Sequence, residues 1–393
     1  MLRRTILKAL ALSAAIALPG AAMAQEVVKV GLILPMTGPF ASTGRQIEAA
    51  AKLYIAENGA EVGGKTIELV VRDDAGVADT TRRIAQELVT REDAKVLAGF
   101  GLTPLALATA PVSTQAKIPT IVMAAATSII TEQSPYIART SFTLPQVTVP
   151  LAQWASENDI AKVVTLVADY GPGLDAEKAF SETFTGAGGE IVEQIRVPVA
   201  NPDFAPFLQR VRDAAPNAVF AFVPSGVGSA LMKQFADRGL SDAGIRLIAT
   251  GDVTDDDILN DMGAPAVGTI TTHHYSAAHD SPENKAFVGA FKAANGGMRP
   301  NFMAVGGYDG MHVIYEALKA TNGETDGDAM MEAIKGLSWT SVRGPVSIDA
   351  ETRDIVQNVY TREVKEVDGE LWNVEFGTPA EAVKDPVKAA AAN

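Results

Sequence analysis

Runs of Val, Ile and Leu alternate along this chain with segments whose apolar residues recur at helical spacing. The first run, at residues 27–34 (VVKVGLIL), ends at Pro35, and Ile47, Ala51 and Tyr54 follow at intervals of four and three. An uninterrupted apolar run is typical of a strand in a parallel sheet, because helices cover both faces of such sheets. The alternation therefore predicts an α/β fold built from repeated strand–helix units.

The strand–helix unit recurs in two halves of similar size. Further parallel strands are predicted at 66–71, 95–98, 119–123, 161–167, 190–197, 217–222 and 245–250, and helices at 78–92, 105–116, 206–214, 282–296, 302–321 and 327–336. Short strands at 138–143 and 269–276 connect the halves, and a β-rich end follows at 344–348, 355–364 and 371–374.

The order of these elements predicts two lobes that are each discontinuous in sequence, because the chain crosses between them about three times. We assign residues 26–142 with 275–340 to lobe 1 and residues 143–274 with 341–376 to lobe 2. Each lobe is expected to be a mostly parallel sheet flanked by helices. Residues 377–393, which are rich in Ala, Pro and Lys, are predicted to form a flexible tail. Two hinged lobes suit closure around a ligand.

Residues 1–24 have the three parts of a secretory signal peptide. Arg3, Arg4 and Lys8 give a basic start, residues 9–18 form an apolar run, and the small residues at 22–24 precede the cleavage site. The apolar run is too short to anchor the chain in a membrane. We expect a periplasmic protein with a cleavable signal and, because the chain has no Cys, no lipid anchor. Whether the signal is of the general secretory or the twin-arginine type stays open.

Composition argues against several classes of function. The chain has 33 Lys and Arg against 47 Asp and Glu, a net charge of −14, and no Cys. Such an acidic balance does not suit binding to nucleic acid or to an anionic membrane surface. The lack of Cys excludes thiolate metal sites and a thiol nucleophile. The four His residues show no metal-ligand spacing. We therefore expect no metal and no cofactor.

Two glycine patterns resemble nucleotide-binding loops but lack the residues that such loops need. The turn at 170–176 (YGPGLDA) follows a strand, but Asp169 would repel a pyrophosphate and no acidic residue ends the next strand. The loop at 225–229 lacks the Gly-Lys-Ser/Thr ending of a phosphate loop. No nucleophile with a matching base is recognisable either. We expect no enzyme activity and no catalytic residue.

Small or hydroxyl-bearing residues occupy the turns that follow the predicted parallel strands. These turns are Thr37-Gly38, Gly101-Leu102-Thr103, Ala124 to Ser128, Tyr170-Gly171, Ser225-Gly226 and Gly251-Asp252. Ligands of open α/β sheets bind at the carboxyl ends of strands. A helix N-terminus there offers unpaired N–H groups to an anion. The pattern predicts a cleft that binds a carboxylate through peptide N–H groups instead of Lys or Arg.

A series of short motifs along residues 27–375 resembles the leucine/isoleucine/valine-binding family of type I periplasmic substrate-binding proteins of ABC transporters. The motifs are Lys29-Val30-Gly31, Pro35 to Pro39 with Gly44, Asn58 with Gly63-Gly64, Asp73-Asp74, Gly99, Ala125-Ala126-Thr127, Tyr170-Gly171, Gly251-Asp252 and Gly307-Tyr308-Asp309. The resemblance implies a two-lobed Venus-flytrap fold joined by about three hinge crossings. It also implies a small-molecule ligand, ABC permease subunits as partners, and a monomer.

The resemblance also implies which residues bind the ligand. Its carboxylate would be bound by the loops at Leu102-Thr103 and Ala125-Ala126-Thr127, through backbone N–H groups and the Thr127 hydroxyl. Tyr170 would cover the ligand from lobe 2, and Asp252 would pair with an ammonium group. Ser225 lies in a neighbouring strand-end turn, and Phe40 and Tyr275 would form apolar walls. The family often has aromatic residues near Thr43 and near Val227-Gly228, where this chain has small ones.

These residues leave the ligand open between two classes. We favour a branched-chain or other hydrophobic amino acid, because Asp252 can neutralise an ammonium group that would be costly to bury unpaired. The alternative is an aromatic carboxylate of the benzoate or cinnamate type, for which the missing aromatics would leave room. A ligand-sensing receptor domain is a second alternative function for the same fold.

Overall fold

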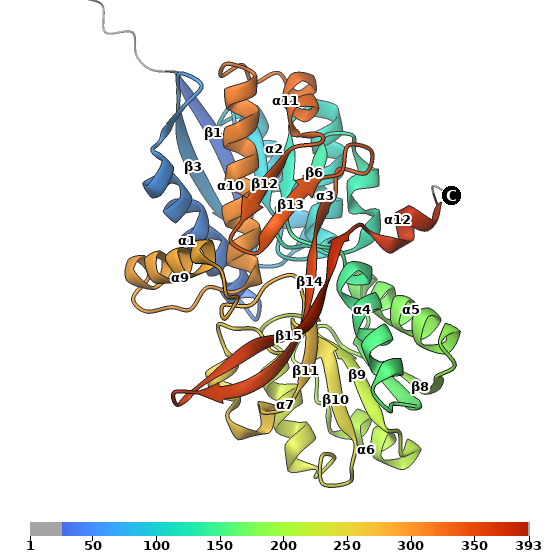
Figure 1. Ribbon diagram of the computed structural model, residues 1–393. Helices are drawn as coiled ribbons and strands as arrows, with labels where there is room; N and C mark the ends of the chain where they lie inside the picture. Colours follow the sequence, from blue (N-terminus) through green and yellow to red (C-terminus); the bar gives the residue numbers. More distant parts are fainter. Residues whose placement is uncertain (1–25, 392–393) are drawn as a thin grey trace, which may run out of the picture.

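The computed structural model describes residues 26–391, and these form two α/β lobes (Figure 1). The predicted signal peptide at residues 1–24 lies outside the described residues. Within residues 26–391, no helix combines the length and the apolar character needed to cross a membrane.

The upper lobe in Figure 1 is built on a sheet of order β2-β3-β1-β4-β5-β6. Its strands are β1 (Val27–Leu34), β2 (Glu61–Val62), β3 (Lys65–Asp73), β4 (Val96–Gly99), β5 (Thr120–Val122) and β6 (Ile137–Arg139). All neighbours pair in parallel except β2 with β3. The helices of this lobe are α1 (Ala41–Asn58), α2 (Ala78–Thr90), α3 (Thr103–Ala116), α9 (Pro282–Ala294), α10 (Phe302–Ala320) and α11 (Gly327–Ile334), with a 3₁₀ turn η1 (Ser128–Gln133).

The second sheet has the order β12-β13-β14-β11-β10-β9-β7-β8, with β15 paired to β14. Its strands are β7 (Lys162–Ala168), β8 (Glu190–Val197), β9 (Ala218–Phe222), β10 (Arg246–Thr250), β11 (Ile270–His273), β12 (Ser338–Ser341), β13 (Gly344–Ile348), β14 (Ile355–Val367) and β15 (Glu370–Val383). Strands β7 to β11 are parallel, and β14 joins β11 in antiparallel register. The lower helices are α4 (Leu144–Glu157), α5 (Gly171–Gly186), α6 (Ala205–Ala214), α7 (Gly228–Asp237) and α8 (Leu259–Met262), with a 3₁₀ turn η2 (Ala264–Ala266).

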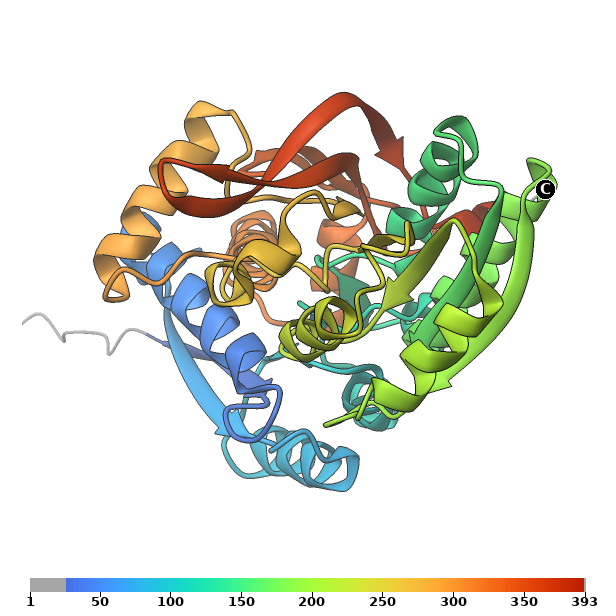
Figure 2. The same ribbon diagram turned by 90° about the horizontal axis from the view of Figure 1, so that it is seen from below.

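The β14–β15 ribbon extends between the two lobes (Figure 1) and curves along one side of the molecule when seen from below (Figure 2). The lobe boundaries assigned from the sequence at residues 142, 274 and 340 stay a prediction. The predicted strand at 138–143 is shorter than expected, because Thr143 is the N-cap of α4. Its backbone N–H donates to the Gln146 side chain, with 2.8 Å between N and Oε1, in a capping box.

The tail prediction needs correction for the part of it that is described. Residues up to Val383 continue β15, and α12 (Pro386–Ala391) follows. Lys388 in this helix is buried, and its Nζ lies 2.6 Å from Asp354 Oδ2. An ion pair between buried side chains fixes the segment, which composition alone could not indicate.

Candidate ligand-binding site

The two lobes form a pocket at the carboxyl ends of their parallel strands. It is lined by Phe40, Thr43, Gly101, Leu102, Thr103, Ala124, Ala125, Ala126, Phe142, Leu144, Tyr170, Pro172, Phe222, Pro224, Ser225, Asp252 and Met303. All of the predicted binding residues except Thr127 and Tyr275 are among them. No Lys or Arg is among the lining residues. A pocket with mostly apolar walls and few polar groups is typical of a small-molecule site.

Lobe 1 presents hydrogen-bond donors to the cavity from the start of α3 and from the loop after β5. Within residues 26–391, the backbone N–H groups of Thr103 and Ala126 have no acceptor. The Thr103 and Thr127 hydroxyl oxygens lie 2.7 Å apart, so one of the two hydroxyls keeps its proton for another acceptor. The first N–H groups of a helix attract anions. This side of the cavity is therefore suited to a carboxylate.

One detail of the predicted carboxylate site needs correction. The Ala125 N–H donates to the Phe100 carbonyl oxygen, with 3.0 Å between N and O, so Ala125 does not have a free donor. Ala125 lines the cavity without this N–H being available. Thr127 lies behind the lining residues, where its hydroxyl bonds to Thr103.

Lobe 2 places a buried carboxylate on the cavity wall. Asp252, which is 4% exposed, follows β10, and its Oδ2 accepts a hydrogen bond of 2.9 Å from the Thr250 hydroxyl. The His273 Nε2 lies 3.6 Å from the same oxygen. Burial lowers the pKa of His273 to about 4, so this ring is neutral near pH 7. Asp252 therefore meets a neutral histidine and can accept a further hydrogen bond from the cavity.

Tyr275 is placed differently from the prediction. Its hydroxyl donates to Asn284 Oδ1 at 2.9 Å, and its carbonyl oxygen accepts a hydrogen bond from the buried Arg362. Arg362 stands behind Gly251, where a Cβ would lie 2.0 Å from its terminal nitrogen. Both side chains belong to the packing below the cavity, so the predicted apolar wall at Tyr275 is wrong.

Aromatic rings from both lobes form most of the apolar wall. Phe40 and Phe142 come from the lobe 1 side, and Tyr170 and Phe222 from lobe 2, where the last two rings are 6.2 Å apart and inclined by 17°. Phe142, Phe222 and Met303 were not predicted as binding residues. Phe222 ends the predicted strand at 217–222, so its place at a strand's carboxyl end was a usable signal. Four rings around one cavity favour a flat, aromatic ligand.

The helix start that presents Tyr170 is fixed by a close approach of backbone to backbone. A Cβ at Gly173 would lie 1.8 Å from the Ala168 carbonyl oxygen, so only glycine lets α5 begin so near the end of β7. Pro172 gives α5 a first turn with a preset φ angle. The sequence pattern at 170–176 thus shapes a cavity wall.

Polar contacts join the lobes around the cavity. The Ser128 N–H donates to Asp175 Oδ2 at 2.9 Å, Asn301 Nδ2 donates to Asp255 at 2.9 Å, and the Ser42 hydroxyl donates to Asp257. These contacts connect elements of the upper and lower lobes, so the structure is a closed form.

Asp255 is expected to make the stability of this form depend on pH. Burial and then the nearby Asp257 raise the pKa of its carboxyl, hydrogen bonds with Ser225 and Asn301 oppose the shift, and the resulting pKa is about 7. Arg362 is the positive charge near it. A carboxyl whose pKa is raised by folding stabilises the protein most at low pH, and the contribution is lost as pH rises from about 4 to about 7.

The measurement is urea unfolding of the wild type and of Asp255→Asn between pH 5 and 7.5. The free energy of unfolding of the wild type relative to this variant should fall by about 1–3 kcal/mol over that range. Asp255→Asn serves as the control. Buried His273 makes the free energy of unfolding depend on pH in the opposite direction, and this contribution is the same in both proteins and cancels in the comparison. If the free energy of unfolding changed with pH in parallel for the two proteins, Asp255 would not be the cause of the pH dependence.

Comparison with known proteins places this geometry in a family. Residues 27–370 match the model of the periplasmic binding protein family. The chain belongs to the periplasmic binding protein family. Leu/Ile/Val-binding protein homolog 6 of Brucella abortus (strain 2308) is 48% identical over 375 residues, which are 94% of this chain and 96% of the relative. The predicted family and the predicted two-lobed α/β fold are both confirmed.

Two solved structures are similar to this periplasmic binding protein over most of its length. A solute-binding protein of an ABC transporter from Rhodopseudomonas palustris BisB5, in complex with 3,4-dihydroxybenzoic acid, is 60% identical with a TM-score of 0.90, covering 92% of this chain and 99% of that one. One from Rhodopseudomonas palustris HaA2, in complex with p-hydroxybenzoic acid, is 43% identical with a TM-score of 0.90, covering 93% and 100%. The chain is thus a solute-binding protein of the ABC-transporter class.

Proposed function

We propose that this protein binds a ring-hydroxylated benzoate in the periplasm and delivers it to the permease subunits of an ABC importer. One observation carries the proposal. The cavity has aromatic walls, unpaired backbone N–H groups on the lobe 1 side, and a buried carboxylate on the lobe 2 side. A hydroxybenzoate has the matching sequence of groups, which is a carboxylate, a ring and a hydroxyl donor.

The charges of the two walls determine which way such a ligand points. Its carboxylate would be repelled by Asp252 and belongs against Thr103 and Ala126, at the positive end of the α3 dipole. Its ring then lies among Phe40, Phe142 and Phe222, and a hydroxyl at the far end reaches Asp252. A phenolic O–H that donates to an ionised carboxylate forms a strong, charge-assisted hydrogen bond.

Closure follows from the same arrangement. A ligand shifts the open–closed equilibrium only by its difference in affinity for the two forms. The carboxylate contacts lie on lobe 1, while Tyr170 and Asp252 lie on lobe 2, so a hydroxybenzoate makes its full set of contacts only when the lobes meet.

A hydrophobic amino acid, which we favoured from the sequence, is the second candidate. The name of the Brucella abortus relative and the presence of Asp252 support it. An amino acid carries its carboxylate and its ammonium group on one carbon, however, and would leave the aromatic walls to an aliphatic side chain. The neighbours in complex with hydroxybenzoic acids support the aromatic candidate.

A thermal-shift panel on the mature protein separates the two candidates. We expect 4-hydroxybenzoate and 3,4-dihydroxybenzoate to raise Tm by about 5–10 °C at saturating concentration, because they bind only the folded state. Leucine, isoleucine and valine should leave Tm unchanged, and benzoate should give a smaller shift. Stabilisation by leucine without any effect of the hydroxybenzoates would overturn the proposal.

A further inference from the structure

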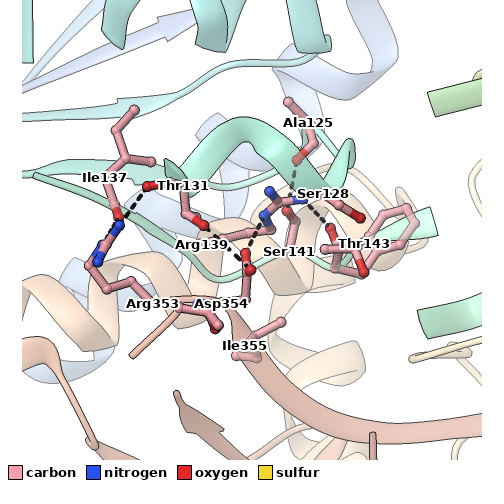
Figure 3. Close-up of polar contacts among 12 residues, drawn as sticks. Ala125, Ser128, Thr131, Ile137, Arg139, Ser141, Thr143, Arg353, Asp354 and Ile355 are labelled. Carbon is pink, nitrogen blue, oxygen red and sulfur yellow. Dashed lines mark hydrogen bonds and ion pairs between the residues drawn. The ribbon is translucent and has the colours of Figure 1, made fainter. Parts of the chain in front are cut away.

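A buried cluster of three charged side chains lies behind the lobe 1 wall of the cavity. Arg139 is fully buried at the end of β6, and its Nε lies 3.0 Å from Asp354 Oδ1. The other carboxylate oxygen of Asp354 lies 2.6 Å from Lys388 Nζ, in α12. Figure 3 shows the Arg139 guanidinium and the Asp354 carboxylate pointing toward one another, with Thr131 on the far side of the carboxylate. We call Arg139, Asp354 and Lys388 the charge cluster.

The remaining nitrogens of Arg139 bond to the backbone of the cavity wall. Nη2 donates to the Thr127 carbonyl oxygen at 2.7 Å, and Nη1 donates to the Phe142 carbonyl oxygen at 3.0 Å. Thr127 supports Thr103 through its hydroxyl, and the Phe142 ring lines the cavity. One buried guanidinium thus fixes two backbone positions that shape the site.

One peptide group of the cavity wall connects the charge cluster to lobe 2. The peptide between Thr127 and Ser128 accepts from Arg139 through its carbonyl and donates through its N–H to Asp175 Oδ2. Hydrogen bonds at the two ends of one peptide polarise it and strengthen each other. The loop that offers the Ala126 N–H is therefore oriented from one side by Arg139 and from the other by the closed second lobe.

The charge cluster lies near an anion site that has no basic lining residue, and further acidic side chains surround it. Two cations share the Asp354 carboxylate, and all three side chains are at most 7% exposed. Glu132 Oε1 lies 3.9 Å from Lys388 Nζ, and Arg139 also interacts electrostatically with the Asp175 carboxylate, so acidic groups balance the two cations. Lys388 further donates to the Thr131 hydroxyl at 2.6 Å. Arg139 therefore acts on a ligand carboxylate through the backbone groups that it holds and not through an excess of positive charge.

We infer that Arg139, Asp354 and Lys388 are positioning residues for the ligand carboxylate, and that the C-terminal helix α12 thereby sets the affinity for an anionic ligand. The inference rests on the proposed function for the nature of the ligand. It assigns a binding role to a C-terminal segment that is remote in sequence from every lining residue.

The test compares Lys388→Met with Lys384→Met. Lys384 is a matched control, because it forms an ion pair with Asp349 at 2.9 Å in the same segment but is 63% exposed. Calorimetry with 4-hydroxybenzoate should show a loss of affinity of about 5- to 30-fold for Lys388→Met and less than about 2-fold for Lys384→Met. For the uncharged 4-hydroxybenzamide, Lys388→Met should lose less than about 2-fold, whereas a purely structural role would weaken both compounds equally.

A second measurement needs no ligand. Hydrogen exchange of the free protein should become faster at residues 124–128 in Lys388→Met and stay unchanged in β7, and Lys384→Met should match the wild type in both segments. Equal losses for the two compounds, or unchanged exchange at 124–128, would overturn the inference. Failure of the wild type to bind 4-hydroxybenzoate would instead count against the proposed function, and the exchange comparison would still decide the inference.

Discussion

Replacing Asp252 by alanine is expected to lower the affinity for 4-hydroxybenzoate by about 10- to 100-fold, since a hydrogen bond to a charged group contributes about 1.5–3 kcal/mol. The affinity for benzoate should stay within about 2-fold of the wild type or rise, because benzoate has no hydroxyl to donate and no longer meets a buried carboxylate. Isothermal titration calorimetry with both ligands measures the two effects on one protein.

Asp252→Asn is the matched control for this variant. It keeps the size of the side chain and one carbonyl acceptor, so it should retain more 4-hydroxybenzoate affinity than Asp252→Ala. Circular dichroism should show the same fold for both, although the Thr250 hydroxyl loses its acceptor in the alanine variant. An equal loss of benzoate and 4-hydroxybenzoate in Asp252→Ala would contradict the orientation, because the carboxylate would then not be the group that distinguishes them.

The fold could be predicted from the sequence because its signals are local. A buried parallel strand is an apolar run whatever its neighbours are, and the predicted run at 27–34 coincides with β1. The cavity residues at Thr103 and Asp252 were predictable for a related reason, since they directly follow such strands. Sheet geometry then brings these turns to one edge.

What the sequence could not show depends on contacts between distant segments. Met303 reaches the cavity from the start of α10, which does not follow a parallel strand. Phe142 follows β6, a strand of only three residues in a segment that the sequence predicted as a crossing between the lobes. Lys388 bonds to Thr131, which is 257 positions away, so no local pattern distinguishes it from the other lysines of the segment. The wrong prediction for Tyr275 also results from contacts between distant segments, because its orientation depends on hydrogen bonds with Asn284 and Arg362.

Replacing Thr43 by tyrosine is expected to lower the affinity for 4-hydroxybenzoate by about 100-fold or more, because the added ring occupies the cavity and overpacks its wall. Thr43 is buried in the first turn of α1 and lines the cavity. A Cβ at Gly101, on the opposite loop, would lie 3.3 Å from its methyl group, so the new ring has no free space except the cavity itself.

The result of Thr43→Tyr also indicates which class of ligand this protein binds. The resemblance to the leucine/isoleucine/valine-binding family places an aromatic residue near this position, so a binder of small aliphatic amino acids should tolerate one there. Calorimetry with 4-hydroxybenzoate and with leucine decides the matter, and Thr43→Ser, which removes only a methyl group, should bind 4-hydroxybenzoate like the wild type. If Thr43→Tyr kept its 4-hydroxybenzoate affinity, the ring of the ligand would have to lie elsewhere than beside α1, and the small residue at 43 would not explain a preference for aromatic acids.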